Sequence, residues 1–166
     1  LATGGFVGWR YRHPTVFYPA SNAIGTSGRM AIGRVNYIGM TYPLGHPTHP
    51  VTLHVDGVSP RVAVNSADAS VAFFVCKFGP HSRAGAIGSE YASDIRKDCP
   101  ILVPASNVDM TVGGGVSDQI VMRIELRRPG TVLVDGMDLH YSVGWQHGWQ
   151  WVGETARFTA LSRPSG

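Results

Sequence analysis

Apolar and polar residues alternate with a period of two in several short stretches of the chain. The clearest stretch is residues 119–127, where every second side chain is a large aliphatic one, and residues 51–56 repeat the pattern. This period is typical of a β-strand with one buried and one solvent-facing side. No stretch of about twelve residues shows the three-and-four spacing of an amphipathic helix. The pattern therefore predicts an all-β protein.

The apolar runs are short and regularly spaced, with turn residues between them. Residues 71–78 are almost wholly apolar, which predicts a central strand. Asp-Gly pairs at 56–57 and 135–136 predict turns, as does the triple glycine at 113–115. The expected strands are residues 5–11, 15–18, 29–38, 51–56, 61–65, 71–78, 102–112 (with breaks), 119–127, 131–135, 137–143 and 155–161.

About ten short strands at this spacing predict an antiparallel β-sandwich of the jelly-roll type. A length of 166 residues fits a single domain over residues 1–166. Residues 162–166 are expected to form a tail or the start of a linker.

One long irregular loop, residues 79–99, interrupts the strand pattern. Residues 89–97 are expected to form one or two helical turns, with Ser89 as the N-cap. Cys76 and Cys99 flank the loop, and an even cysteine count in an exported chain favours a disulfide that closes it. By the chain-entropy model such a bridge stabilises by roughly 3 kcal/mol. The alternative is two unpaired thiols, with Cys76 a buried core residue.

The composition excludes several classes of protein. An apolar fraction of 43% with only 15% charged residues excludes a disordered chain. No apolar run approaches the roughly 20 residues that span a bilayer, so no membrane span is expected. The net charge is +3, but the basic residues are scattered and form no stripe, so nucleic acid is not an expected partner.

A tryptophan-rich segment, residues 144–151, is the strongest local anomaly in the sequence. Three of the four tryptophans lie within it, and they share one face if the segment is extended. Indole rings stack on the apolar faces of sugars, while amide and imidazole groups bind hydroxyls. The alternative is that these rings pack in the sandwich or between subunits. The candidate ligand-binding residues here are Trp145, Gln146, His147, Trp149, Gln150 and Trp151.

The long loop adds two cationic candidates, Arg83 and Arg96. Their guanidinium groups would favour sialylated or sulfated sugars through charge-assisted hydrogen bonds. A loop pinned by a disulfide to a rigid scaffold is a common place for recognition. The alternative is a crossover connection with no binding role.

Motifs for catalysis or metal binding are missing from the sequence. His46, His49 and His54 lie close together, but Pro47 and Pro50 preclude a helix that would align them. There is no G-x-S-x-G motif, and the triple glycine lacks the Lys-Ser/Thr that follows in a phosphate-binding loop. We therefore expect no catalytic residue, no metal and no cofactor, although a glycosidase carboxylate pair would leave no sequence signature.

Residues 128–139 (R-P-G-T-V-L-V-D-G-M-D-L) resemble the closing strand pair of jelly-roll carbohydrate-binding modules. The resemblance covers about a dozen residues and implies a jelly-roll fold and sugar binding. Gly136 stands where those modules often carry Asp, which puts a calcium role for the region in doubt. Fimbrial lectin domains with a single disulfide match the chain in size and class.

These observations favour a non-catalytic, lectin- or adhesin-like carbohydrate-binding domain at the cell surface or outside the cell. Its expected partner is a glycan or glycoconjugate, and homo-oligomerisation is left open. One alternative is a capsid or fibre subunit of a virus or phage, in which the exposed aromatics make subunit contacts within the virion. Another is a glycan hydrolase on the same scaffold.

Overall fold

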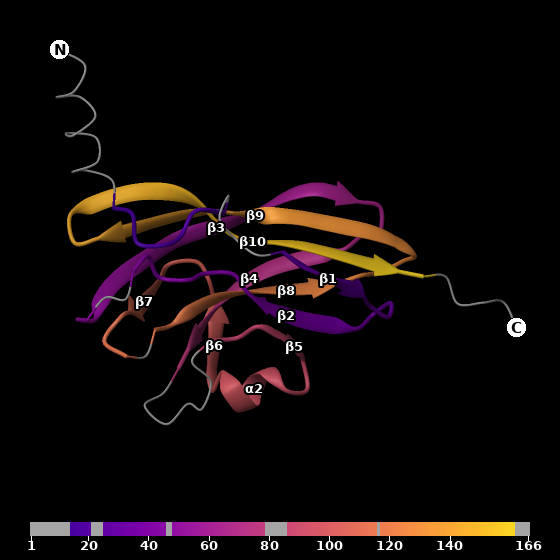
Figure 1. Cartoon of the computed structure of the whole chain (residues 1–166), viewed down its shortest axis with the longest axis horizontal. Coiled ribbons are helices and arrows are strands. Elements are labelled where there is room, and N and C mark those ends of the chain that lie inside the picture. The colour runs from indigo at the N-terminus through magenta and orange to yellow at the C-terminus, as the bar shows by residue number, and fades with distance from the viewer. Residues whose placement is uncertain (1–13, 21–24, 46–47, 79–85, 116, 162–166) are drawn as a thin grey trace, which may run out of the picture.

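The computed structural model describes residues 14–20, 25–45, 48–78, 86–115 and 117–161. Two five-stranded sheets pack face to face (Figure 1), which confirms the expected all-β sandwich. The first sheet has the order β1-β10-β9-β3-β7, and the second has the order β5-β2-β8-β4-β6. The elements are β1 (Thr26–Arg29), β2 (Val35–Gly39), β3 (Val51–Asn65), β4 (Ser70–Lys77), β5 (Ser89–Tyr91), α2 (Ile95–Asp98), β6 (Ile101–Pro104), β7 (Val108–Val112), β8 (Gln119–Glu125), β9 (Gly130–Val143) and β10 (Gln146–Ala160).

The chain passes repeatedly from one sheet to the other. Strands β2, β3 and β4 alternate between the second and the first sheet, and β7, β8 and β9 do the same in the opposite sense. Neighbouring strands are antiparallel, except that the short β1 runs parallel to β10. This alternation between two antiparallel sheets is the arrangement expected of a jelly roll.

The main core lies between the two sheets and contains the side chains that the sequence pattern assigned to one face. Ile120, Met122, Ile124 and Leu126 are all fully buried there. They meet side chains of the first sheet, among them the buried Tyr141 of β9. The period-two pattern of residues 119–127 therefore identified a core-facing strand correctly.

The outer side of the second sheet has a core of its own. The segment 86–99, which we call the cap, covers this side and includes β5 and α2 (Figure 1). The expected disulfide between Cys76 and Cys99 joins the cap to β4. Under the cap, the outward side chains of β4 and β8 include the apolar Cys76 and Val121, whereas the outward Arg123 and Glu125 of β8 form an ion pair. The small core under the cap consists of Cys76, Phe78, Ile87, Ile95, Cys99 and Val121.

The cap approaches the second sheet most closely at Gly39 of β2. A Cβ atom at this position would collide with the carbonyl oxygen of Ile87 and with the amide of Gln119. The buried Gln119 side chain accepts a hydrogen bond from the Ile87 N–H at 2.7 Å and donates one to the Thr41 carbonyl at 3.3 Å. Glycine at 39 and the paired amide at 119 thus allow the cap to approach β2 closely with the buried Gln119 amide hydrogen-bonded.

Several strand boundaries that we predicted are wrong, chiefly because bulges resemble turns in sequence. Residues 51–65 form one strand, and Asp56-Gly57 lies at a register shift between Val55 and Gly57 instead of a turn. Strand β9 likewise continues through Gly136, whose φ of +70° gives a bend inside the strand. The expected pair 131–135 and 137–143 is therefore one strand.

Other expected elements also differ from the structure. The expected strand 29–38 is split by a turn into the end of β1 and the start of β2. Ser89 belongs to β5, and Asp94 takes the N-cap position of α2. Residues 15–18 contribute an isolated bridge from Phe17 to Pro43. The expected strand 5–11 and the tail 162–166 lie outside the described residues. Most important for function, β10 begins at Gln146, so the tryptophan segment belongs to the first sheet.

We expect loss of the disulfide to destabilise the protein through the cap. A Cys76→Ala/Cys99→Ala variant should lose about 3 kcal/mol of unfolding free energy, because the bridge closes a loop of 23 residues. Urea unfolding followed by tryptophan fluorescence measures the change. An unfolding free energy equal to that of the oxidised parent would contradict the assignment of the cap to the folded core.

Glu90 makes the cap sensitive to pH. Burial, followed by the neighbouring Asp98 carboxylate, raises the pKa of Glu90 above its ordinary value of 4.5, and its Oε2 atom is buried without a hydrogen-bond partner among the described residues. The stabilisation linked to this group is complete below the unfolded pKa and is lost as the pH rises through the higher folded pKa. Glu90→Gln should therefore raise the melting temperature at pH 8 and change it little at pH 4.

Asp94→Asn is the matched control for this prediction. The Lys97 ammonium lowers the pKa of Asp94, so the charged form of this carboxylate favours the folded state. Its amide variant should lower the melting temperature at pH 8, opposite to Glu90→Gln. Equal effects of Glu90→Gln at pH 4 and pH 8, measured by thermal unfolding, would contradict this account of the cap.

Candidate functional site

The outer side of the first sheet, which we call the open face, carries no cap within the described part of the chain (Figure 1). Cross-strand pairing arranges its outward side chains in three rows across β10, β9, β3 and β7. Neighbouring strands lie about 4.8 Å apart, and neighbouring rows, two residues along a strand, lie about 7 Å apart. The rows are His147–Ser142–His54–Asp109, Trp149–His140–Gly57 and Trp151–Asp138–Ser59.

Trp149 stands in the middle row and is the most open aromatic group on these strands. Its side chain is 55% exposed and makes no hydrogen bond, ring contact or cation–π contact with any described residue. The exposed His140 lies beside it on β9, and Gly57 follows on β3. Nothing lies within 4 Å of the point where a Cβ of Gly57 would stand. Trp149 therefore presents an exposed indole next to His140, with open space above Gly57 one strand farther on.

Trp151 is held in place by polar contacts in the third row. Its Nε1–H donates to the Asp135 carbonyl at 2.8 Å, and the Arg61 guanidinium lies 4.6 Å from the ring centroid. Arg61 is fixed in turn by Asp138, to which its Nε donates at 3.0 Å and its Nη2 at 2.8 Å. This arrangement supports Trp151 and leaves Arg61 paired with a carboxylate.

The part of β10 that carries the tryptophans is also anchored by hydrogen bonds on its core-facing side. The Gln150 amide oxygen accepts from the Val16 N–H at 3.2 Å, and the amide nitrogen donates to the Phe17 carbonyl at 3.2 Å. The hydroxyl of the buried Tyr141 contacts the same Gln150 oxygen, and burial raises the pKa of Tyr141 to about 12. The backbone that carries Trp149 and Trp151 is thereby fixed before any ligand arrives.

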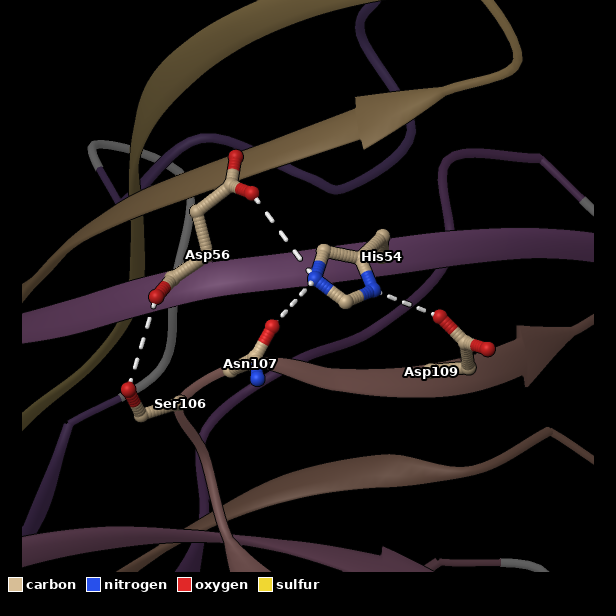
Figure 2. Close-up of polar contacts among 5 residues, drawn as sticks. All are labelled: His54, Asp56, Ser106, Asn107 and Asp109. Atoms are coloured by element: carbon tan, nitrogen blue, oxygen red, sulfur yellow. Dashed lines mark hydrogen bonds and ion pairs between the residues drawn. The ribbon is translucent and has the colours of Figure 1, made fainter.

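Five polar residues gather at the β3–β7 end of the open face, and we call them the His54 cluster: His54, Asp56, Ser106, Asn107 and Asp109. Figure 2 shows the His54 ring between Asp109 on one side and Asn107 and Asp56 on the other. The Nδ1 atom lies 2.6 Å from the Asp109 carboxylate, and Nε2 lies 3.1 Å from the Asn107 amide oxygen. Nε2 is also 4.0 Å from the Asp56 carboxylate.

The hydrogen bond with Asp109 is the main reason why the pKa of His54 is raised above 6.5. Asn107 adopts a left-handed backbone conformation, with φ of +52°, which asparagine tolerates better than most residues. The Ser106 hydroxyl contacts the Asp56 carbonyl at 3.5 Å. The cluster thus offers carboxylate and amide groups at the surface on two paired strands.

The structure brings together only some of the residues that the sequence suggested. His147, Trp149 and Trp151 share the open face, and Trp145 is 64% exposed in the turn before β10. Gln146 and Gln150 alternate to the other side of the strand, and the Gln150 amide is occupied within the fold.

The two cationic candidates do not join the open face. Arg96 belongs to α2 in the cap, on the opposite side of the sandwich from β9 and β10 (Figure 1). Arg83 lies outside the described residues. The structure therefore gives no arrangement in which Arg96 and Trp149 contact one ring.

Sequence reasoning missed the His54 cluster, Arg61, Asp138 and His140. A signal was present, because His54 and Asp56 occupy the polar positions of the alternating run V-T-L-H-V-D. Asp138 and His140 alternate in the same way in M-D-L-H-Y. Polar, chemistry-bearing residues on the outward side of two strands were identifiable, but the pairing of these strands was not.

No group of three or more His, Cys, Asp or Glu side chains among the described residues is arranged to hold a metal ion. His46, one of the three clustered histidines, lies outside the description. Over the same residues, no helix is long and apolar enough to cross a membrane.

Comparison with known proteins gives no family. No family model matches the chain, and no curated protein matches it. One similar solved structure is a family 123 glycoside hydrolase from Clostridium perfringens, analysed for the details of glycolipid glycan hydrolysis. It is 11% identical with a TM-score of 0.36, and the match covers 90% of this chain and 26% of that one. The chain thus spans about a quarter of that protein, and a similarity at this level establishes neither fold nor activity.

The pKa of His54 should depend on its contact with Asp109. We expect nuclear magnetic resonance to show a His54 pKa above 6.5 and Asp109→Asn to lower it, because the charged partner at Nδ1 is lost. An unchanged His54 pKa in Asp109→Asn would show that this contact is not formed in solution.

The sign of the linked stability follows from the raised pKa. The stabilising contribution of protonated His54 is complete below pH 6.5 and is lost as the pH rises through the folded pKa. Asp109→Asn should therefore lower the melting temperature more at pH 6 than at pH 9.

Proposed function

We propose that this protein is a non-catalytic carbohydrate-binding domain that acts outside the cytosol, and that the open face is its glycan-binding surface. The observation that carries the proposal is Trp149, an exposed indole with no polar or aromatic partner among the described residues, on a strand whose core-facing Gln150 is hydrogen-bonded. The experiments below also test the two alternative functions of the protein, a capsid or fibre subunit and a glycan hydrolase.

Trp149 suits sugar binding because its ring is exposed and the strand that carries it is anchored. Tryptophan is highly buried on average, so a ring that stays 55% exposed on a regular strand is unusual. Strand β10 lies between β1 and β9, so its backbone is paired on both sides along part of its length. A rigid aromatic surface loses little conformational entropy when a ligand ring stacks on it.

Polar groups with both acceptor and donor character lie close to this ring. His140 is adjacent on β9, and the His54 cluster follows in the neighbouring row. Binding sites for small molecules combine an apolar surface with a few placed polar groups that fix orientation. Sugar hydroxyls both donate and accept hydrogen bonds, so a mixed imidazole, amide and carboxylate set is suited to them.

The disulfide supports a location outside the cytosol. Bridges such as Cys76–Cys99 form and persist in oxidising compartments and are rare in the reducing cytosol. A surface or secreted domain would meet glycans in that environment.

Trp149→Ala should weaken glycan binding while leaving the fold intact. A central tryptophan contact is worth about 2 kcal/mol when truncated, so we expect a loss of about thirtyfold in affinity. A glycan array identifies the ligand, and isothermal titration calorimetry on the best glycan measures the loss. Tyr91→Ala is the control, because Tyr91 is also an exposed aromatic (42%) but lies in the cap.

The same protein preparation tests the rival functions. A blank array with correctly folded protein would contradict the proposal, and a large closed assembly by light scattering would then favour a capsid or fibre subunit. Mass spectrometry of a bound glycan after incubation tests catalysis. Cleavage products would overturn the non-catalytic part of the proposal and favour a hydrolase.

A further inference from the structure

We infer that the open face takes an extended, uncharged oligosaccharide that reaches from Trp149 to the His54 cluster. This inference rests on the proposed function and deepens it, since it names the length and the charge of the ligand. Three observations support it: the separation of the two ends, the small residues between them and the charges that line the face.

The two ends of the proposed site are too far apart for a single sugar. Trp149 is on β10 and His54 is on β3, with β9 between them, and they lie in adjacent rows. Two strand spacings and one row spacing place their backbones about 12 Å apart. This distance is longer than one pyranose ring. A ligand that touches both ends must therefore contain at least two linked rings.

The residues between the two ends include two small ones. Ser142 separates His54 from His147 in the first row, and Gly57 lies next to His140 in the second. Ser142 is only 9% exposed, and the space above Gly57 is open. A chain of sugar rings can therefore cross from Trp149 towards His54 over Ser142, with the exposed His140 as the large β9 side chain beside its path.

The charges on this part of the face disfavour an anionic glycan. The carboxylates of Asp56 and Asp109 are 48% and 68% exposed, and the His54 ring lies between them. Arg61, in the third row, is already neutralised by two-point contact with Asp138. Arg157 lies farther along β10, beyond the irregularity between Val152 and Thr155. A sialylated, sulfated or uronic-acid ligand would meet two carboxylates before it met an unpaired arginine.

The His54 cluster can bind hydroxyls at the far end of such a ligand. Ionised Asp56 and Asp109 accept hydrogen bonds, whereas the Asn107 amide both donates and accepts. Figure 2 shows these groups arranged around one imidazole ring. Neighbouring hydroxyls on one sugar ring match an acceptor and a donor placed side by side.

The test is a calorimetric series on the full chain. The ligands are the neutral sugar identified on the array as one, two, three and four linked rings, and the same oligosaccharide carrying one carboxylate or sulfate. We expect affinity to rise about tenfold or more from one ring to three. The anionic versions should bind about tenfold more weakly than their neutral counterpart.

Four variants test the two ends and the path between them. Asp109→Asn should weaken the three-ring ligand and leave the single ring unchanged, whereas Trp149→Ala should weaken both. Gly57→Tyr should block the three-ring ligand, and Gly57→Ala should be nearly neutral. Both glycine variants should fold, because a Cβ at this position meets no atom within 4 Å. Thermal unfolding verifies this for each protein.

The outcomes separate the inference from the proposed function. If a single ring binds as tightly as three, or if Gly57→Tyr binds normally, the extended site is wrong although sugar binding stands. If the anionic ligand binds more tightly than the neutral one, the inference about charge is wrong. If no glycan of any length binds the folded protein, the proposed function itself fails.

Discussion

The architecture depends on one constraint, which is that the second sheet carries apolar side chains on part of its outer side as well as towards the main core, and these outer side chains need a cover. Strands β4 and β8 carry large apolar groups towards the main core and further ones, including Val121 and Cys76, on the outside. Burying such side chains stabilises by about 25 cal/mol per Å² of apolar surface, so leaving the outer ones exposed would be costly. The cap supplies that cover. The disulfide and the close contact at Gly39 keep it in place.

The first sheet has the opposite character, because its outer side carries no cap among the described residues and is the recognition surface that we propose. Its inner side chains complete the main core, while its outer side carries Trp149, His140 and the His54 cluster. The inward Gln150 fixes the strand from behind. A ligand that binds the open face therefore meets side chains whose backbone is already ordered. Preorganisation of this kind reduces the entropy lost on binding.

The sequence predicted the parts of this structure that depend on local patterns. The period of two in β8, the wholly apolar β4 and the pair Cys76–Cys99 each carry their signal within a few residues. The misplaced boundaries arise where one local signal has two physical meanings. An Asp-Gly pair serves a turn or a bulge equally well, and at Gly57 and Gly136 it lies within a continuous strand.

The candidate site was only partly predictable for a different reason. The tryptophans were evident, but Arg61 and Asp138 are 77 residues apart, and His54 and Asp109 are 55 apart. Their contacts exist because of the register of β3 with β9 and β7, which no local pattern encodes. Gln150 shows the converse. Its type and position suggested a ligand contact, while its side chain forms hydrogen bonds that anchor the strand.

The central claim is that the open face, and not the cap, is the recognition surface. The most direct measurement is a heteronuclear correlation spectrum recorded while neutral oligosaccharides are added to the oxidised protein, with each amide signal assigned. The account predicts concentration-dependent shifts in the outward-facing residues of β3, β7, β9 and β10, centred on Trp149 and His140, with the cap unaffected. Shifts centred on residues 86–99, or no shift with any oligosaccharide at millimolar concentration, would contradict it.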